Sequence, residues 1–356
     1  MSRIDWLLLR RIGGRVVVTV LVFYGLITLV ESLDTWRFNN LAARGGPQLA
    51  VFGVMISATH WTIKTLSVTV LLGAILGLLE LQRSREMIII KASGISIWRI
   101  LRVPLIAIAL FGCAVAFYGD SLVTAINRNL TPTIQSENGT LISGSGMWLE
   151  QSDGKVPYIL TAEKQSGRGT RIENVVIFFL TNPDEGRIVA PTGRLVAGAW
   201  ELDGARRLHV TGPAENLPGF TIATATTAAE LSLRLTATED YTLYELLSAL
   251  GASVGDPVVA AAAATRVARL IAMPGLLVGA LLIAFAFTAG YRRTHKYGAA
   301  ILYGVVLGLV VFVLTEMADR AGSAGVLAPA IAAAGPAFIA VIIGLTVLLY
   351  KEDGRA

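Results

Sequence analysis

Very few residues of this sequence are arranged in a way that predicts catalysis or metal binding. The three histidines are far apart and are not expected to converge on one metal: His60, His209 and His295. Adjacent carboxylates at Asp184-Glu185 and Glu239-Asp240 stand in turn-like contexts, where a solvated surface is the better interpretation. The motifs G-x-x-x-x-G-K-[ST] and H-E-x-x-H are both absent. We therefore predict no catalytic residue, no metal site, no cofactor and no nucleotide hydrolysis on this chain.

Ionisable side chains near the ends of apolar runs are clearer candidates for a binding site. Six of them are expected at one side of the membrane: Arg37, His60, Lys64, Arg128, Arg266 and Arg269. Charged groups at such positions are costly and usually face a cavity or a partner. Each one taken singly also fits an interfacial anchor whose head group snorkels to the surface. Together they favour a lateral cavity in which Lys and Arg pair with the phosphates of an anionic, amphipathic lipid.

The segment Glu80–Arg102, ELQRSREMIIIKASGISIWRILR, is a short, basic and partly apolar stretch between two long apolar runs. Its run Met87–Ile90 is too short to cross a bilayer, which needs roughly 20 apolar residues. Ser84 is a candidate N-cap, Glu86 suits the first turn, and Gly94 is a candidate stop, so we expect a helix over 84–94. This helix either lies on the lipid headgroups or inserts as a coupling helix into a groove of a cytosolic partner.

Composition places the chain among integral membrane proteins. Of its 356 residues, 54% are hydrophobic and 15% charged, with a mean hydropathy of +0.64. The apolar residues are concentrated in runs long enough to span a bilayer: Ile12–Val30, Phe52–Leu79, Ile100–Leu122, Arg266–Ala289, Gly298–Met317 and Val326–Tyr350. We predict six transmembrane helices, arranged as three, an insertion, and three more.

The distribution of Lys and Arg between the short loops predicts the orientation of these helices. If the N-terminus is cytoplasmic, the cytoplasmic segments hold fourteen basic residues, and the opposite short loops hold three, Arg37, Arg44 and Arg320. By the positive-inside rule both termini and the segment 84–94 are therefore expected in the cytoplasm. This asymmetry also accounts for the sequence pI of about 9.4, so nucleic-acid binding is an unnecessary inference.

The insertion has a sequence pattern typical of a β domain. Short alternating or β-branched stretches recur at Gly146–Glu150, Val156–Ala162, Ile172–Leu180, Leu208–Thr211 and Phe220–Thr227. Turn signals such as Asn138-Gly139 and Asp203-Gly204 separate them. We expect an all-β domain of jelly-roll type on the outer side of the membrane. The predicted division is residues 1–122 for the first transmembrane half, 123–258 for the β domain and 259–356 for the second half.

The stretch LLGAILGLLELQRSREMIIIKASGIS, Leu71–Ser96, resembles the signature of the lipopolysaccharide export permeases, the LptF/LptG family. The resemblance extends along essentially the whole chain and includes the segment GMWLEQSDGKVPYI, Gly146–Ile159. The segments Arg266–Pro274 and Ala284–Arg293 look more like the LptG branch than the LptF branch.

This resemblance implies a transport subunit of the bacterial inner membrane. Such permeases pair as LptF and LptG, bind the cytosolic ATPase LptB, and pass lipopolysaccharide through a periplasmic jelly roll to a bridge of LptC and LptA. The helix over 84–94 would then be the coupling helix, with Glu86 at the position of the family's ATPase-contacting glutamate. The residues expected to contact the ATPase are Ser84, Arg85, Glu86, Met87, Ile90, Lys91 and Gly94. Arg37 would keep a lipid-contacting charge of the family, and Lys64 would replace a lysine found about where His60 stands.

Two other function classes remain open at this point. An ion-driven secondary transporter would require interrupted helices near the middle of the membrane, for which Pro274-Gly275 is one candidate break. A membrane-anchored scaffold for envelope assembly would not require charges in a cavity. Only the exporter is expected to hold an ATPase through the helix over 84–94.

Overall fold

The computed structural model describes residues 3–84, 86–92, 94, 96–130, 147–152, 157–166, 169–180, 186–196, 198–209, 212–235, 238–251, 256–288 and 297–352. The chain divides into two units, each described here by itself. The first, which we call the helical unit, comprises Met1–Leu130, Tyr241–Tyr244 and Ala264–Ala356. The second, which we call the sheet unit, comprises Thr131–Asp240 and Glu245–Ala263.

The first half of the helical unit contains six helices, of which several are long and apolar. Their bounds are α1 Arg3–Ser32, α2 Thr35–Lys64, α3 Leu66–Arg83, α4 Glu86–Ala92, α5 Ile97–Ala114 and α6 Asp120–Leu130. A π-helical turn, η1 Val115–Gly119, joins α5 to α6 without a break in the helix. The predicted boundary at residue 123 therefore falls inside a helix that continues to Leu130.

The remaining helices follow the sheet. They are α7 Ala228–Leu235, α8 Leu243–Gly251, α9 Pro257–Thr288, α10 Tyr297–Ser323 and α11 Pro329–Glu352, with a short 3-10 turn at Thr238–Asp240. Five helical segments of the described chain are long and apolar enough to cross a membrane: Ile4–Ser32, Leu66–Arg83, Ile97–Leu130, Pro257–Thr288 and Pro329–Tyr350. The predicted run Gly298–Met317 lies within α10, which is not among these five, so the count of six spans stays a prediction.

The second predicted span, Phe52–Leu79, needs correction. The helix stops at Lys64, the chain turns at Thr65, and α3 starts at Leu66, so the apolar run is divided between two helices. Helix α2 is itself kinked, because Gly45 and Gly46 have non-helical backbone angles and Gly46 has a φ of 77°, which favours glycine. The candidate break at Pro274-Gly275 is absent, since α9 is continuous through both residues.

The core of the helical unit depends on small residues that let helices approach closely. A Cβ atom on Gly73 of α3 would lie 2.6 Å from Cα of Val16 on α1, and one on Gly77 would lie 3.0 Å from Cα of Ile12. Glycines spaced by four residues allow such backbone contact between membrane helices. Helices α1 and α3 therefore form one closely packed pair. Helix α4 packs against the same hydrophobic core.

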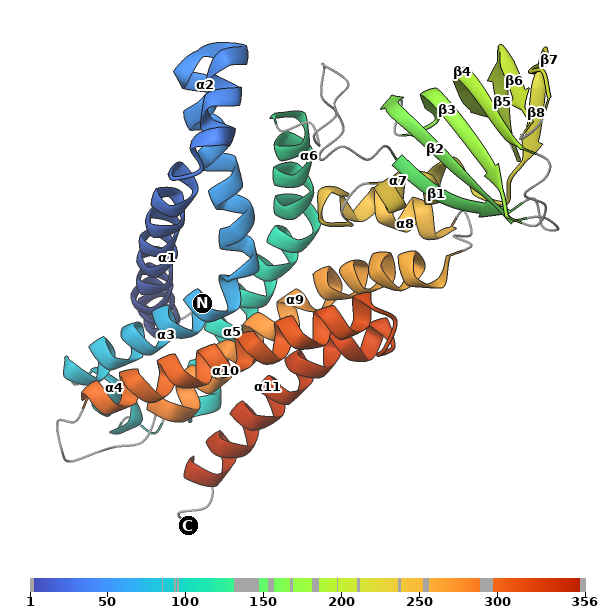
Figure 1. Cartoon of the computed structure of the whole chain (residues 1–356). Coiled ribbons are helices and arrows are strands. Elements are labelled where there is room, and N and C mark those ends of the chain that lie inside the picture. Colours follow the sequence, from blue (N-terminus) through green and yellow to red (C-terminus); the bar gives the residue numbers. More distant parts are fainter. Residues whose placement is uncertain are drawn as a thin grey trace. The chain divides into compact units, whose positions relative to one another are not determined.

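The sheet unit contains an antiparallel sheet, whose strands are labelled in Figure 1. Its strands are β1 Met147–Ser152, β2 Pro157–Ser166, β3 Arg171–Phe179, β4 Arg187–Val196, β5 Ala199–Asp203, β6 Ala205–Leu208, β7 Glu215–Leu217 and β8 Phe220–Ala223. The first five are neighbours in chain order. The register of β4 with β5 continues into its register with β6, and the interruption lies where Pro191 faces Gly204. Proline has no N–H to donate at that point of the ladder.

Strands β5 and β6 show the same continuity on their other side, where they pair with β8 and β7. The registers of β8 with β5 and of β7 with β6 are also continuous, with Pro218 opposite Gly204. The described strands thus form a meander of successive antiparallel neighbours, and the expected jelly roll is not confirmed. The buried face includes Trp200, whose indole N–H donates to Oε1 of Gln151 at 3.1 Å, and Leu231 of α7. The sheet therefore has a hydrophobic core of its own.

Candidate functional site

The α4 segment follows α3 and begins with a correction at Ser84. This residue ends α3 as its C-cap, and its hydroxyl donates to the Leu81 carbonyl at 3.3 Å, so it is not the N-cap of α4. Helix α4 starts at Glu86 and is seven residues long. Gly94 has a φ of 78°, a conformation that favours glycine and suits the predicted stop. Arg85 and the side chain of Lys91 lie outside the described residues.

The aliphatic side chains of α4 differ in their exposure. Met87 and Ile90 are 4% and 8% exposed and belong to the same hydrophobic core as Leu8 and Leu81. Their spacing of three residues places them on one face of the helix. Ile89 lies between them and is 67% exposed. Met87 and Ile90 therefore pack against their own chain, and Ile89 presents an apolar side chain at the surface of α4.

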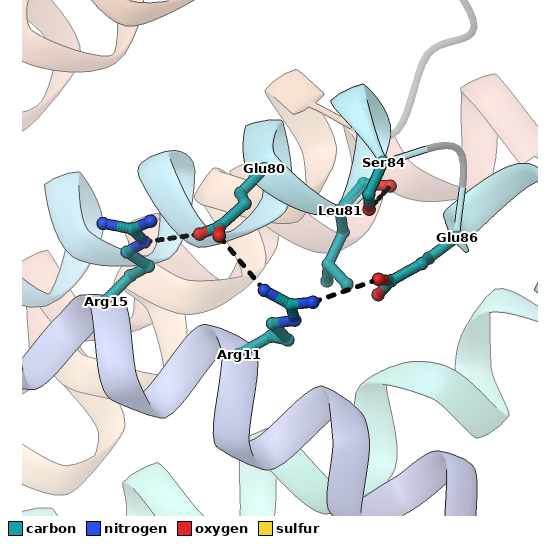
Figure 2. Close-up of polar contacts among 6 residues, drawn as sticks. All are labelled: Arg11, Arg15, Glu80, Leu81, Ser84 and Glu86. Carbon is teal, nitrogen blue, oxygen red and sulfur yellow. Dashed lines mark hydrogen bonds and ion pairs between the residues drawn. The ribbon is translucent and has the colours of Figure 1, made fainter.

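A network of ion pairs links the start of α4 to α1 and α3, as Figure 2 shows. Arg11 of α1 contacts Glu80 of α3 through Nη1 at 3.2 Å and Glu86 of α4 through Nη2 at 3.3 Å. Arg15 donates from Nε to the other carboxylate oxygen of Glu80. The sequence carried one signal of this network, because arginines four residues apart on a helix share a face.

At the other end of α1, the predicted lipid contact Arg37 is part of an internal polar cluster. Its guanidinium donates to Oγ of Ser57 at 2.9 Å and to Oδ1 of Asn127 at 2.8 Å, and it lies 3.8 Å from a carboxylate oxygen of Glu31. Ser57 in turn donates to Glu31 at 2.6 Å. Arg37 thus joins α1, α2 and α6 while its side chain remains 18% exposed.

Three further predicted contacts lie near the ends of α2 and α6. Lys64 is the last residue of α2, and its Nζ lies 4.6 Å from the ring centroid of Trp61. His60 stands one turn earlier on the same helix and is half-buried. Arg128 is half-buried in the last turn of α6.

The two arginines of α9 are paired with carboxylates that the sequence analysis did not identify. Arg266 donates from Nη2 to both oxygens of Asp120 on α6, at 2.9 and 3.0 Å, and the two side chains are 7% and 2% exposed. Arg269 donates from Nη1 to Asp319 on α10 at 2.7 Å, and its Nη2 lies 4.0 Å from Glu316. Asp120 directly follows the π-helical turn, a feature that is frequent at functional sites.

A small cavity of about 50 Å³ brings several of these groups together. Its charged lining residues are three cations and three carboxylates: Lys64, Arg266, Arg269, Asp120, Glu316 and Asp319. The formal charges therefore cancel, and the volume suits a few water molecules rather than a lipid headgroup. Three of the six predicted lipid contacts do converge here, but the expected excess of positive charge is offset by acidic partners. Among the described residues, no group of three His, Cys, Asp or Glu side chains is placed to hold a metal ion.

A comparison with models of protein families gives an independent result. The model described as "Lipopolysaccharide export system permease LptF/LptG" matches residues 6–350. A search of curated proteins finds no match. The family match covers nearly all of the sequence, including both sets of apolar helices and the sheet between them. It does not distinguish LptG from LptF. The chain belongs to the LptF/LptG family of lipopolysaccharide export permeases, inner-membrane transport subunits that act together with other Lpt proteins.

Proposed function

We propose that this chain is the LptG-type permease of an ATP-driven exporter that extracts lipopolysaccharide from the inner membrane. In this proposal a separate cytosolic ATPase, LptB, supplies the energy, and a sibling permease, LptF, completes the membrane part. The extracted lipid passes to a periplasmic bridge of LptC and LptA. The chain itself hydrolyses nothing, in keeping with a sequence that has no P-loop.

The observation that carries this proposal is the exposed isoleucine on a helix that is otherwise attached to the protein. A connector between two helices has no need of an apolar surface, yet Ile89 is 67% exposed on α4. The same helix is held in place by the burial of Met87 and Ile90 and by the ion pair of Glu86 with Arg11. A fixed, protruding apolar side chain suits insertion into a groove on a partner. In this proposal Ser84, Lys91 and Gly94 contact the ATPase near Ile89.

The proposed orientation follows from the distribution of basic residues. With α4 and both termini in the cytoplasm, the sheet unit lies in the periplasm. The predicted lipid contacts then stand toward the periplasmic side. Arg37, Arg266 and Arg269 already face carboxylates, so a lipid phosphate would have to exchange with those carboxylates.

The first test is purification of the solubilised protein with its partners. The wild-type chain should copurify with an ATPase and should support ATP-dependent transfer of lipopolysaccharide from liposomes. Ile89→Asp places a charge in the proposed groove and should remove the ATPase from the purified complex. Leu33→Asp is the matched control, because Leu33 is 76% exposed at the opposite end of α1. This variant should retain the ATPase.

Two results would contradict the proposal. One is transfer of lipopolysaccharide by the wild-type chain in the absence of any ATP-hydrolysing protein. The other is equal retention of the ATPase by Ile89→Asp and Leu33→Asp. The continuous helix α9 gives no support to the alternative of a secondary transporter, which requires interrupted helices.

A further inference from the structure

Arg11 holds a position between the proposed coupling helix and the membrane helices. We infer that Arg11 is a positioning residue that passes a displacement of α4 on to α1. A conformational change of the ATPase that displaces α4 would then also move the first membrane helix. This inference rests on the proposed function, in which the ATPase displaces α4. It concerns a different step, the passage of the displacement from α4 into the membrane.

The geometry of the guanidinium supports this role. Arg11 uses two different nitrogens for two different elements, Nη1 for Glu80 of α3 at 3.2 Å and Nη2 for Glu86 of α4 at 3.3 Å (Figure 2). The planar fork of arginine holds two carboxylates in a fixed mutual position, whereas a lysine ammonium acts as a point charge. Arg11 therefore fixes the first residue of α4 relative to the last turn of α3.

The carboxylate of Glu86 is directed toward this network rather than toward solvent. Its Oε1 accepts from Arg11, and its Oε2 is buried with no hydrogen-bond partner among the described residues. Its side chain is 25% exposed. Glu86 thus attaches the start of α4 to α1.

The receiving element is suited to move as one body. Gly73 and Gly77 bring the backbones of α3 and α1 into direct contact, and Arg15 joins the two helices again at Glu80. Met87 and Ile90 attach α4 to the same hydrophobic core as Leu8 of α1. A displacement of α4 therefore reaches α1 through packed side chains and an ion-pair network together, which is the kind of contiguous connection that carries coupling.

A purely structural role would predict a different result from a coupling role. The side chains of Arg11 and Glu80 are 45% and 30% exposed, and ion pairs of this exposure contribute little to stability. Loss of Arg11 should therefore leave folding and ATPase association nearly unchanged. It should reduce the amount of lipopolysaccharide transferred per ATP hydrolysed, by roughly fivefold or more if the link carries a coupling free energy of ordinary size.

The experiment compares variants in the complex of full-length permease, sibling permease and ATPase. For each, the thermal unfolding midpoint, the retained ATPase, the rate of ATP hydrolysis and the transfer of lipopolysaccharide are measured. Arg11→Gln should retain the ATPase and lose transfer per ATP. Arg11→Lys should recover only part of the transfer, because one ammonium cannot reproduce the fork. The exchange Arg11→Glu with Glu86→Arg should recover more than either single variant does.

Arg10→Gln is the matched control. Arg10 is the preceding residue of α1, is exposed, and makes no ion pair with the described part of the chain. Normal transfer per ATP in Arg11→Gln would overturn the inference while leaving the proposed function intact, provided that the wild type retains the ATPase. Loss of the ATPase from Arg11→Gln, with an unchanged unfolding midpoint, would also overturn it, since Arg11 would then act in binding. A wild type that holds no ATPase would instead contradict the proposed function itself.

Discussion

At the scale of single residues, the most demanding arrangement is the ion pair of Arg266 with Asp120. Both side chains are almost fully buried in helices of membrane-spanning length, and two hydrogen bonds join them. Removing two charges from water is costly, so such a pair gives little net stability relative to an apolar pair of the same volume. Loss of one partner alone is much worse, since the remaining charge stays buried without compensation.

This asymmetry predicts the behaviour of three variants. Arg266→Leu should lower the free energy of unfolding by about 3–5 kcal/mol, because Asp120 loses its counter-charge. The double variant Arg266→Leu with Asp120→Leu should recover most of this loss. Arg320→Leu is the control, since the side chain of Arg320 is 81% exposed and its pairing with Glu316 is expected to contribute only about 0.3–0.5 kcal/mol. Denaturation in detergent measures all three, and a single variant as stable as the wild type would exclude a structural role for the pair.

The acidic partners also show what the sequence could not predict about single residues. Arg266 and Arg269 are visible as charges at the start of an apolar run, but their partners lie on other helices, 146 and 50 residues away. Helical periodicity tells which residues share a face of one helix, and it does not tell which faces of different helices meet. Asp120 could have been noticed on its own, because an ionisable residue inside a membrane-length apolar run predicts a functional or structural partner.

At the scale of elements, the packing of α1 against α3 depends on the absence of side chains at two positions. A Cβ on Gly73 would meet the backbone of Val16 at 2.6 Å, a distance at which the helices must separate. Flexible side chains elsewhere could adjust, but the backbone of α1 cannot do so locally. The contact of the two helices is therefore set by Gly73 and Gly77, and the attachment of α4 depends on it.

We predict that Gly73→Ala destabilises the protein despite the better helix propensity of alanine. Overpacking of a tight interface typically costs about 1–3 kcal/mol. Gly25 lies on α1 with no atom within 4 Å of an added Cβ, so Gly25→Ala should be neutral or slightly stabilising. The thermal unfolding midpoints of both variants in detergent check this. Equal midpoints for the two variants would show that α1 and α3 are less closely packed than described.

Elements differ in how well the sequence predicted them. Strands β1, β2 and β3 were expected because their β-branched stretches are regular and bounded by turn signals. Strand β4 was missed, because Pro191 and Gly193 interrupt its alternation of buried and exposed residues. Proline and glycine are both uncommon inside strands. The α4 helix was expected, but its exposed face was not, because the consecutive aliphatic residues of 87–90 have no period that distinguishes one face from another.

At the scale of the whole molecule, the helical unit and the sheet unit each have a hydrophobic core. The family match over residues 6–350 includes both units. The proposal places α4 in the cytoplasm and the sheet in the periplasm. This assignment depends on the asymmetry of Lys and Arg and can be measured separately from transport.

The orientation is tested by labelling single cysteines in intact bacteria. Cys113 is the only cysteine, so a Cys113→Ser background is free of thiols. Ala92 of α4 and Glu201 of β5 are both exposed, and each is replaced by cysteine in that background. A maleimide that enters the periplasm but does not cross the inner membrane should label Glu201→Cys in intact cells and Ala92→Cys only after lysis. Labelling of Ala92→Cys in intact cells would place α4 in the periplasm, where no ATPase could reach it, and would remove the physical basis of ATP-driven coupling through this helix.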